Sequence, residues 1–205
     1  MADQNVVGGT ESLTSAQAAM QRGQFTLALR LCEDALLANP ADLDTLMLAA
    51  SAATRSGDTE KAVGYASRAV ELNPNDATGY AVLGRCYLAS RNPEEAVLQF
   101  STAIAREPGQ PILYQLLGQA LEAADRNVEA VEAFKQAIKM APHLIEAHIS
   151  LGQLHIKLGN RSEASHCFLR AHKLEPNSAR GLIQLAKVQI EGVEYEKGRR
   201  QPTQG

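Results

Sequence analysis

The chain has 205 residues, 45% of them hydrophobic, which is the size and composition of a folded domain and excludes disorder over most of its length. Its 23 acidic and 20 basic residues are mixed along the chain and leave a net charge of −3, too little to attract nucleic acid or an anionic membrane. Aromatic residues make up only 4% and tryptophan is absent, which favours thin, closely packed helices and an all-α protein.

The N-terminus and the cysteines together predict the compartment. Residues 1–20 contain no basic start and no apolar run of signal-peptide length, and the chain nowhere has about 18 consecutive apolar residues, so we expect no membrane insertion. Cys32, Cys86 and Cys167 are widely separated and lack CxxC spacing, as is typical of small buried residues in a reducing compartment. We therefore expect a cytoplasmic protein without disulfides.

A repeated pattern begins at about Thr10, after an N-terminus of residues 1–9 that we expect to be disordered. Its clearest marker is a proline every 34 residues, and a fixed period of this size indicates a stacked array. These prolines are Pro40, Pro74, Pro108, Pro142 and Pro176. Each ends a helix, because proline has no N–H to donate and restricts the residue before it.

Each unit is expected to contain two helices and a short turn. In the third unit Tyr80, Leu83 and Tyr87 lie on one helical face, residues 91–93 break the pattern, and a second helix follows through Ala96. Glycines that can adopt the left-handed conformation occupy the equivalent turn in three units, namely Gly23, Gly57 and Gly159. Side chains that can cap the next helix are Asp42, Asp76 and Ser178.

Residues 34 positions apart form columns, and four of these columns predict how the helices pack. Two contain only alanine: Ala28, Ala62, Ala96, Ala130 and Ala164, then Ala35, Ala69, Ala103, Ala137 and Ala171. A column of small residues follows the first helices: Ala16, Ala50, Gly84, Gly118, Gly152 and Ala186. A column with larger residues follows the second helices: Cys32, Ala66, Phe100, Phe134 and Phe168. We expect the large residues to pack onto the small ones of a neighbouring helix.

The order Tyr80…Leu83-Gly84…Tyr87…Ala96…Phe100…Ala103…Pro108, largely repeated in the fourth unit, resembles the tetratricopeptide repeat family. The resemblance covers residues 10–191, as five repeats and a partial sixth. It implies a right-handed α-solenoid of about ten helices with a C-terminal capping helix, and it implies that the first helix of each repeat lines the concave side. The polar face of the first unit suits an end cap.

A sixth unit starts after Pro176 and is then interrupted. Residues 192–198 resemble the turn and the start of another second helix, but Pro202 ends it, so we expect an aborted repeat and a flexible tail over residues 192–205. Ile183 and Ile190 lie away from the packing face of the last helix. This apolar end favours either self-association through the C-terminal helix or a longer protein of which this chain is a part.

The concave groove that the resemblance implies is the predicted binding site, and its residues lie opposite the packing face. The candidates are Met47, Ser51, Arg85, Gln115, Gln119, Ile149, Gln153, Ile156 and Lys187. Arginine, glutamine and lysine can bond the amides and carboxylates of an extended peptide, and isoleucine accepts its apolar side chains. We predict a protein or peptide partner with neutral or acidic segments. The alternative is that these polar side chains are simply solvated surface.

No catalytic, cofactor or metal site is predicted. The phosphate-loop, dinucleotide-binding and nucleophile-elbow motifs are absent from the sequence. His148 and His155 are seven residues apart on one helical face, but they occupy the columns of Tyr80 and Tyr87, so packing explains them better than metal binding.

The leading prediction is therefore a non-enzymatic scaffold or adaptor that holds a peptide or protein in its groove. One alternative is the N-terminal, substrate-positioning repeat region of a larger enzyme, similar to repeat-bearing sulfotransferases and glycosyltransferases. A second alternative is a self-assembling repeat protein that stacks end to end through its last helix.

Overall fold

The computed structural model describes residues 3–187, with side chains from Ser12 onwards, and this part of the chain is entirely helical between its turns. The helices are α1 (Asp3–Gln21), α2 (Phe25–Ala38), α3 (Leu43–Ser56), α4 (Thr59–Leu72), α5 (Ala77–Ala89), α6 (Pro93–Arg106), α7 (Pro111–Ala123), α8 (Asn127–Met140), α9 (Ile145–Lys157) and α10 (Arg161–Leu174). A further helical stretch covers residues 179–187, where the described part ends. The predicted series of paired helices is confirmed.

The boundaries of the array differ in one place from those expected. The first helix begins at Asp3, so residues 3–9, expected to be disordered, are helical here. The helix can extend this far because no proline interrupts it, even though Gly8 and Gly9 are weak helix formers. The aborted sixth repeat and the flexible tail expected over residues 192–205 lie outside the described residues.

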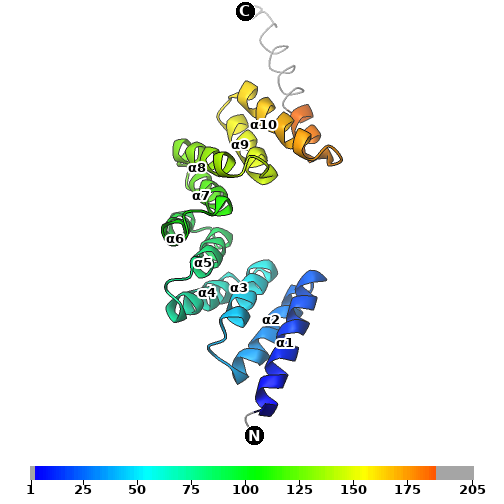
Figure 1. Cartoon of the computed structure of the whole chain (residues 1–205), viewed down its shortest axis with the longest axis vertical. Coiled ribbons are helices and arrows are strands. Elements are labelled where there is room, and N and C mark those ends of the chain that lie inside the picture. The colour runs from blue at the N-terminus through cyan, green and yellow to red at the C-terminus, as the bar shows by residue number, and fades with distance from the viewer. Residues whose placement is uncertain (1–2, 188–205) are drawn as a thin grey trace, which may run out of the picture.

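The helices stack in chain order into a bent array. Figure 1 shows α1 and the last described residues on one side of the bend and α6 on the other. Each helix packs on the next one, and the odd-numbered helices also contact each other directly, as α3 does with α5 and α5 with α7. Elements on the inside of a bend lie closer together than those on the outside, so the odd-numbered helices form the concave face.

The turn inside each unit uses the left-handed conformation that the glycines predict. The φ angles are 73° at Gly23, 89° at Gly57 and 79° at Gly159. The equivalent positions in the third and fourth units hold Arg91 and Asp125, which adopt φ angles of 60° and 59°. A side chain in this conformation costs roughly 1–2 kcal/mol, and the packing of the flanking helices keeps both residues there.

The core of the three C-terminal units is centred on three phenylalanines that pack against small residues. The rings of Phe100, Phe134 and Phe168 are fully buried. Each lies against the glycine that stands 16 positions before it, so closely that a Cβ built on Gly118 would lie 2.7 Å from the Phe134 ring. In the first two units the second helix carries Cys32 or Ala66 instead, and alanine replaces the glycine at Ala16 and Ala50. Where the second helix carries a smaller side chain, the first helix therefore carries a larger one, and the space between them stays filled.

Two glycine substitutions test this packing. We expect Gly118→Ala to lower the free energy of unfolding by about 1–3 kcal/mol, because the new methyl group displaces the Phe134 ring. Gly64→Ala is the matched control: nothing lies within 4 Å of the added atom, so alanine should stabilise α4 by about 0.5–1 kcal/mol. Denaturant unfolding followed by circular dichroism measures both, and equal changes of one sign would contradict this account of the core.

Candidate peptide groove

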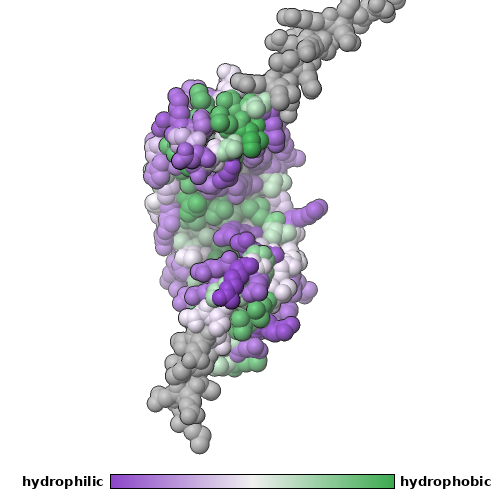
Figure 2. All heavy atoms as spheres, turned by 90° about the vertical axis from the view of Figure 1, so that its right-hand side faces the viewer, coloured by the Kyte–Doolittle hydropathy of each residue, from purple (hydrophilic) through white to green (hydrophobic). Residues whose placement is uncertain are grey.

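The centre of the concave face contains a cavity between α5 and α7. Its volume is about 230 Å³. It is lined by Ala77, Thr78, Ala81, Val82, Arg85, Glu107, Gln110, Ile112, Leu113 and Leu116. Most of these side chains are apolar, and the space-filling view of this side shows hydrophobic surface across the middle of the molecule (Figure 2). The cavity can therefore accept an apolar side chain of a ligand that lies along the groove.

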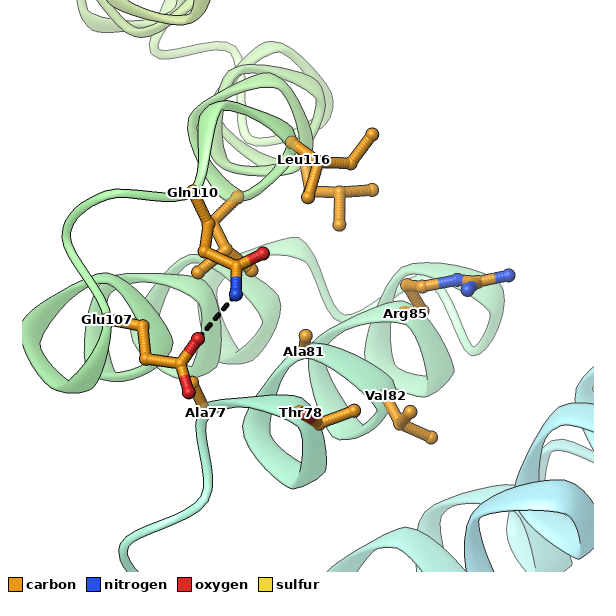
Figure 3. Close-up of a pocket in the computed structure, with 10 residues that line it drawn as sticks. Ala77, Thr78, Ala81, Val82, Arg85, Glu107, Gln110 and Leu116 are labelled. Atoms are coloured by element: carbon orange, nitrogen blue, oxygen red, sulfur yellow. Dashed lines mark hydrogen bonds between the residues drawn. The ribbon is translucent and has the colours of Figure 1, made fainter. Parts of the chain in front are cut away.

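Polar groups stand at opposite ends of this cavity. Gln110 donates a hydrogen bond from its side-chain amide to the carboxylate of Glu107, in the turn between α6 and α7. The guanidinium of Arg85 points away from this pair, at the far end of α5 (Figure 3). Arg85 is exposed, and it forms no ion pair within residues 3–187. Its five N–H groups are therefore available to carbonyl or carboxylate oxygens of a ligand.

A second, smaller cavity extends the groove from Arg85 towards α3. It has a volume of about 20 Å³ and is lined by Ser51, Thr54, Arg55, Val82, Arg85 and Cys86. The structure thus brings together two predicted groove residues, Ser51 and Arg85. The Ser51 hydroxyl donates to the Met47 carbonyl oxygen at 2.9 Å, so its proton is already used within the helix. Ser51 can accept a further hydrogen bond but has none left to donate.

Two predicted groove residues are buried. Gln115 is only 5% exposed and Ile149 only 7%, so neither offers a ligand much surface. Both belong to the column beside Arg85 and Gln119, and the close approach of neighbouring odd-numbered helices on the inside of the bend covers this column. Met47 is half-buried for the same reason and packs against the core of the first two units.

The remaining predicted residues lie on the concave helices but away from the α5–α7 cavity. Gln119 is half-buried on α7, and Gln153 is exposed on α9. Ile156 packs beside the cluster around Phe168, and Lys187 is exposed at the end of the described chain. Among the predicted groove residues, Arg85 alone lines the larger cavity.

Sequence reasoning missed the wall of the larger cavity. Val82 and Leu116 belong to a single column and form part of that wall, yet neither was among the predicted groove residues. Ile112 also lines it and is 45% exposed, so part of its side chain is open to a ligand. Large apolar residues in one column of the first helices were the signal for this surface. Glu107 and Gln110 reach the cavity because of the path of the turn between α6 and α7, and the 34-residue columns do not predict the path of a turn.

Burial accounts for the pKa shifts of the ionisable groups Glu122 and Cys86 near the groove. Burial raises the pKa of Glu122 on α7, and the positive charge of Lys157 partly opposes this increase. Lys157 itself pairs with Asp125 at 2.8 Å. Burial raises the pKa of the Cys86 thiol, which lies 3.4 Å from the Thr54 hydroxyl. A protonated, buried thiol is a poor nucleophile, so Cys86 contributes packing here.

The two histidines that share a helical face, His148 and His155, are buried in α9. The Nε2 atom of His148 lies 3.0 Å from the Pro142 carbonyl oxygen, as the Tyr80 hydroxyl lies 3.2 Å from the Pro74 carbonyl oxygen two units earlier. His155 likewise stands in the column of Tyr87. Within residues 3–187 no three histidine, cysteine or acidic side chains cluster closely enough to hold a metal ion.

The fold is that of an α-solenoid repeat protein, and the comparisons with known proteins identify the family. Family models described as Tetratricopeptide repeat match residues 13–77, 53–120 and 121–182. The chain therefore belongs to the tetratricopeptide repeat family. Proteins of this family typically bind other proteins. No curated protein matches the chain.

Solved structures of repeat proteins have the same architecture. TTC0263, a thermophilic protein of Thermus thermophilus, is 22% identical with a TM-score of 0.77, over 89% of this chain and 99% of that one. MamA from Desulfovibrio magneticus RS-1 is 22% identical with a TM-score of 0.70, over 83% and 97%. YrrB, described as having an unusual peptide-binding site, is 16% identical with a TM-score of 0.62, over 83% and 88%. These similarities confirm the solenoid fold.

A membrane-spanning helix is not found among the described residues, because none of their helices combines sufficient length with sufficient hydrophobicity.

The buried histidines predict how stability depends on pH. Burial lowers the pKa of both His148 and His155, so the folded state binds fewer protons than the unfolded chain below about pH 6.5. Their contribution to stability is thus complete at neutral pH and is lost as the pH falls. We expect His148→Tyr/His155→Tyr, which places tyrosine in both columns, to lose less stability between about pH 7 and pH 5 than the wild type.

Urea unfolding across this pH range measures the effect. The control replaces His143 and His166, both exposed, with glutamine. That variant should lose stability as steeply as the wild type, and a flattened profile for the control alone would contradict the assignment.

Proposed function

We propose that this protein is a non-catalytic scaffold that holds an extended segment of a partner protein in its concave groove. The observation that carries the proposal is the α5–α7 cavity, where apolar walls and the exposed guanidinium of Arg85 lie on the same face. An extended peptide presents side chains alternately with backbone amides and carbonyls. One of its apolar side chains enters the cavity while Arg85 bonds a neighbouring carbonyl or carboxylate oxygen.

The charge around Arg85 supports a neutral or acidic segment. Arg55 lines the smaller cavity together with Arg85, so two cations lie along this part of the groove. Arg55 also stacks on Phe25, with its guanidinium carbon 4.3 Å from the ring centroid, and this contact holds it in place. An acidic residue of the partner next to its apolar anchor would gain from both cations. The described peptide-binding site of YrrB, a structural relative, is consistent with such a role.

The free thiols support a cytoplasmic location for the scaffold. All three cysteines are unpaired, and Cys32 and Cys86 are buried. Burial raises the pKa of Cys32 to about 11, so its thiol stays protonated and unreactive at neutral pH. These cysteines act as small apolar residues, which suits a reducing compartment.

Peptides selected by phage display against the whole chain test the groove. We expect selected peptides to combine an apolar anchor with an acidic residue, and Arg85→Glu to weaken their binding about tenfold or more in fluorescence anisotropy. Thr78→Trp should also weaken binding, because Thr78 is exposed at the cavity and the indole would occupy it. Arg68→Glu on α4 is the control, with the same charge change outside both cavities. Selected peptides that bind Arg85→Glu and Thr78→Trp as tightly as wild type would refute the proposed groove.

A second candidate function is self-association through the C-terminal end, and exposed apolar side chains favour it. Leu182 is 45% exposed and Ile183 is 51% exposed in the helical stretch 179–187. Side chains of this size at the end of a solenoid gain stability when another repeat stacks on them. Sedimentation velocity at low and high concentration should then show a larger species that Ile183→Glu removes, whereas a monomer at both concentrations would exclude this function.

A further inference from the structure

A third cavity lies away from the groove, between the even-numbered helices α8 and α10 and against α9. Its volume is about 420 Å³, within the range of small-molecule sites, about 300–1,000 Å³. It is lined by Lys135, Ile138, Lys139, His148, Leu151, His166, Cys167 and Arg170. None of these residues lines either cavity of the groove. It is therefore a separate place on the molecule, and the proposed scaffold function does not use it.

The rim of this cavity is positively charged. Lys139 and Arg170 are exposed, and neither forms an ion pair with another residue in the described part of the chain. Lys135 pairs with Glu132 at 3.0 Å on the surface, which neutralises part of its charge. Glu163 lies one helical turn before Cys167 on α10 and does not line the cavity, although its charge helps to raise the pKa of the Cys167 thiol. Two cations thus remain without a partner beside an apolar floor of Ile138 and Leu151.

The same positions in earlier units show that the fold does not require these cations. One unit earlier, Lys135, Lys139 and Arg170 correspond to serine, alanine and glutamine, at Ser101, Ala105 and Gln136. Two units earlier, the corresponding residues are Ser67, Glu71 and Thr102. The helices of all these units pack in the same order, each on the next one along the chain. Three basic side chains therefore line this junction, at positions where the two preceding units have neutral or acidic residues.

His148 also makes the wall of this cavity different from the equivalent surface in the two preceding units. Its column holds Tyr80 and Tyr114 in the two preceding units. His148 keeps the contact with the proline carbonyl oxygen that Tyr80 makes, at 3.0 Å compared with 3.2 Å. An imidazole is smaller than a phenol, however, so the exchange preserves the structural hydrogen bond and leaves space between α8 and α10. The basic residues Lys139 and Arg170 and the space beside His148 thus occur at the same junction.

We propose that this cavity binds a small organic anion, with its apolar part on Ile138 and Leu151 and its carboxylate or phosphate group held by Lys139 and Arg170. The guanidinium and the ammonium group donate charge-assisted hydrogen bonds to the anionic oxygens. The apolar floor stabilises the organic part of the ligand by burying it, a contribution that a free inorganic anion would not gain.

Three probes of equal chain length test the proposal on the whole chain: octanoate, octyl phosphate and uncharged 1-octanol. Nuclear magnetic resonance titration follows the backbone amides of Leu151 and Cys167. We expect saturable shifts at these amides with at least one of the two anions, at an affinity about tenfold higher than for 1-octanol. The two anions distinguish a carboxylate ligand from a phosphate ligand. Equal affinity for 1-octanol, or no saturable shift with either anion, would overturn the proposal.

Variants that introduce residues of the preceding unit make the test specific. Lys139→Ala/Arg170→Gln should weaken anion binding about tenfold while leaving the fold intact, because Ala105 and Gln136 occupy these positions one unit earlier. His148→Tyr should abolish binding, because the phenol fills the space. Lys173→Ala removes one exposed charge from α10 outside the cavity and is the control. If Lys173→Ala weakens binding as much as the double substitution, the effect is one of general charge and the site is refuted.

Discussion

The contact between a glycine on the first helix of a unit and a phenylalanine on the second is the constraint on which the rest of the structure depends. At Gly84, Gly118 and Gly152 the ring of the partner phenylalanine occupies the space of a Cβ atom. Because neither partner can change size alone, this contact sets the distance between the two helices of the unit. The alanine columns allow neighbouring helices to approach closely, since their members are almost fully buried. The odd-numbered helices also contact each other directly, which places them on the inside of the bend.

This framework divides each unit into positions that packing determines and positions that it leaves free. The two buried alanine columns are identical in all five units, whereas the exposed positions of α5 and α10 differ strongly from their equivalents. Arg85 with its apolar cavity and the cations around Arg170 both occupy free positions. Packing does not require these cations, so the residues at these positions can differ between units without disturbing the fold. The two surfaces are on different helices, and a partner on one leaves the other accessible.

Sequence columns predicted the helices, the turns and the core, because each of those features depends on residue size or backbone conformation at a fixed period. The left-handed turn of Gly57 and the burial of Phe134 are examples that the structure confirms. The groove was predicted only in part. Gln115 and Ile149 point towards the inner face but are covered where neighbouring helices converge, and that convergence depends on the bend and not on the period. Glu107 and Gln110 depend on the course of a turn, and the α8–α10 cavity arises from a size difference at His148 that resembles ordinary packing in the sequence.

The uneven distribution of phenylalanine along the chain gives the array a direction. The three C-terminal units each bury a whole aromatic ring at the glycine contact, whereas the first two units have only Cys32 and Ala66 at that position. Each unit contacts only its neighbours, so a unit with less apolar surface to bury gains no stability from a distant one. The two ends of the array therefore respond differently to the same change: a substitution at the glycine contact displaces a ring in the three C-terminal units and only a small side chain in the first two.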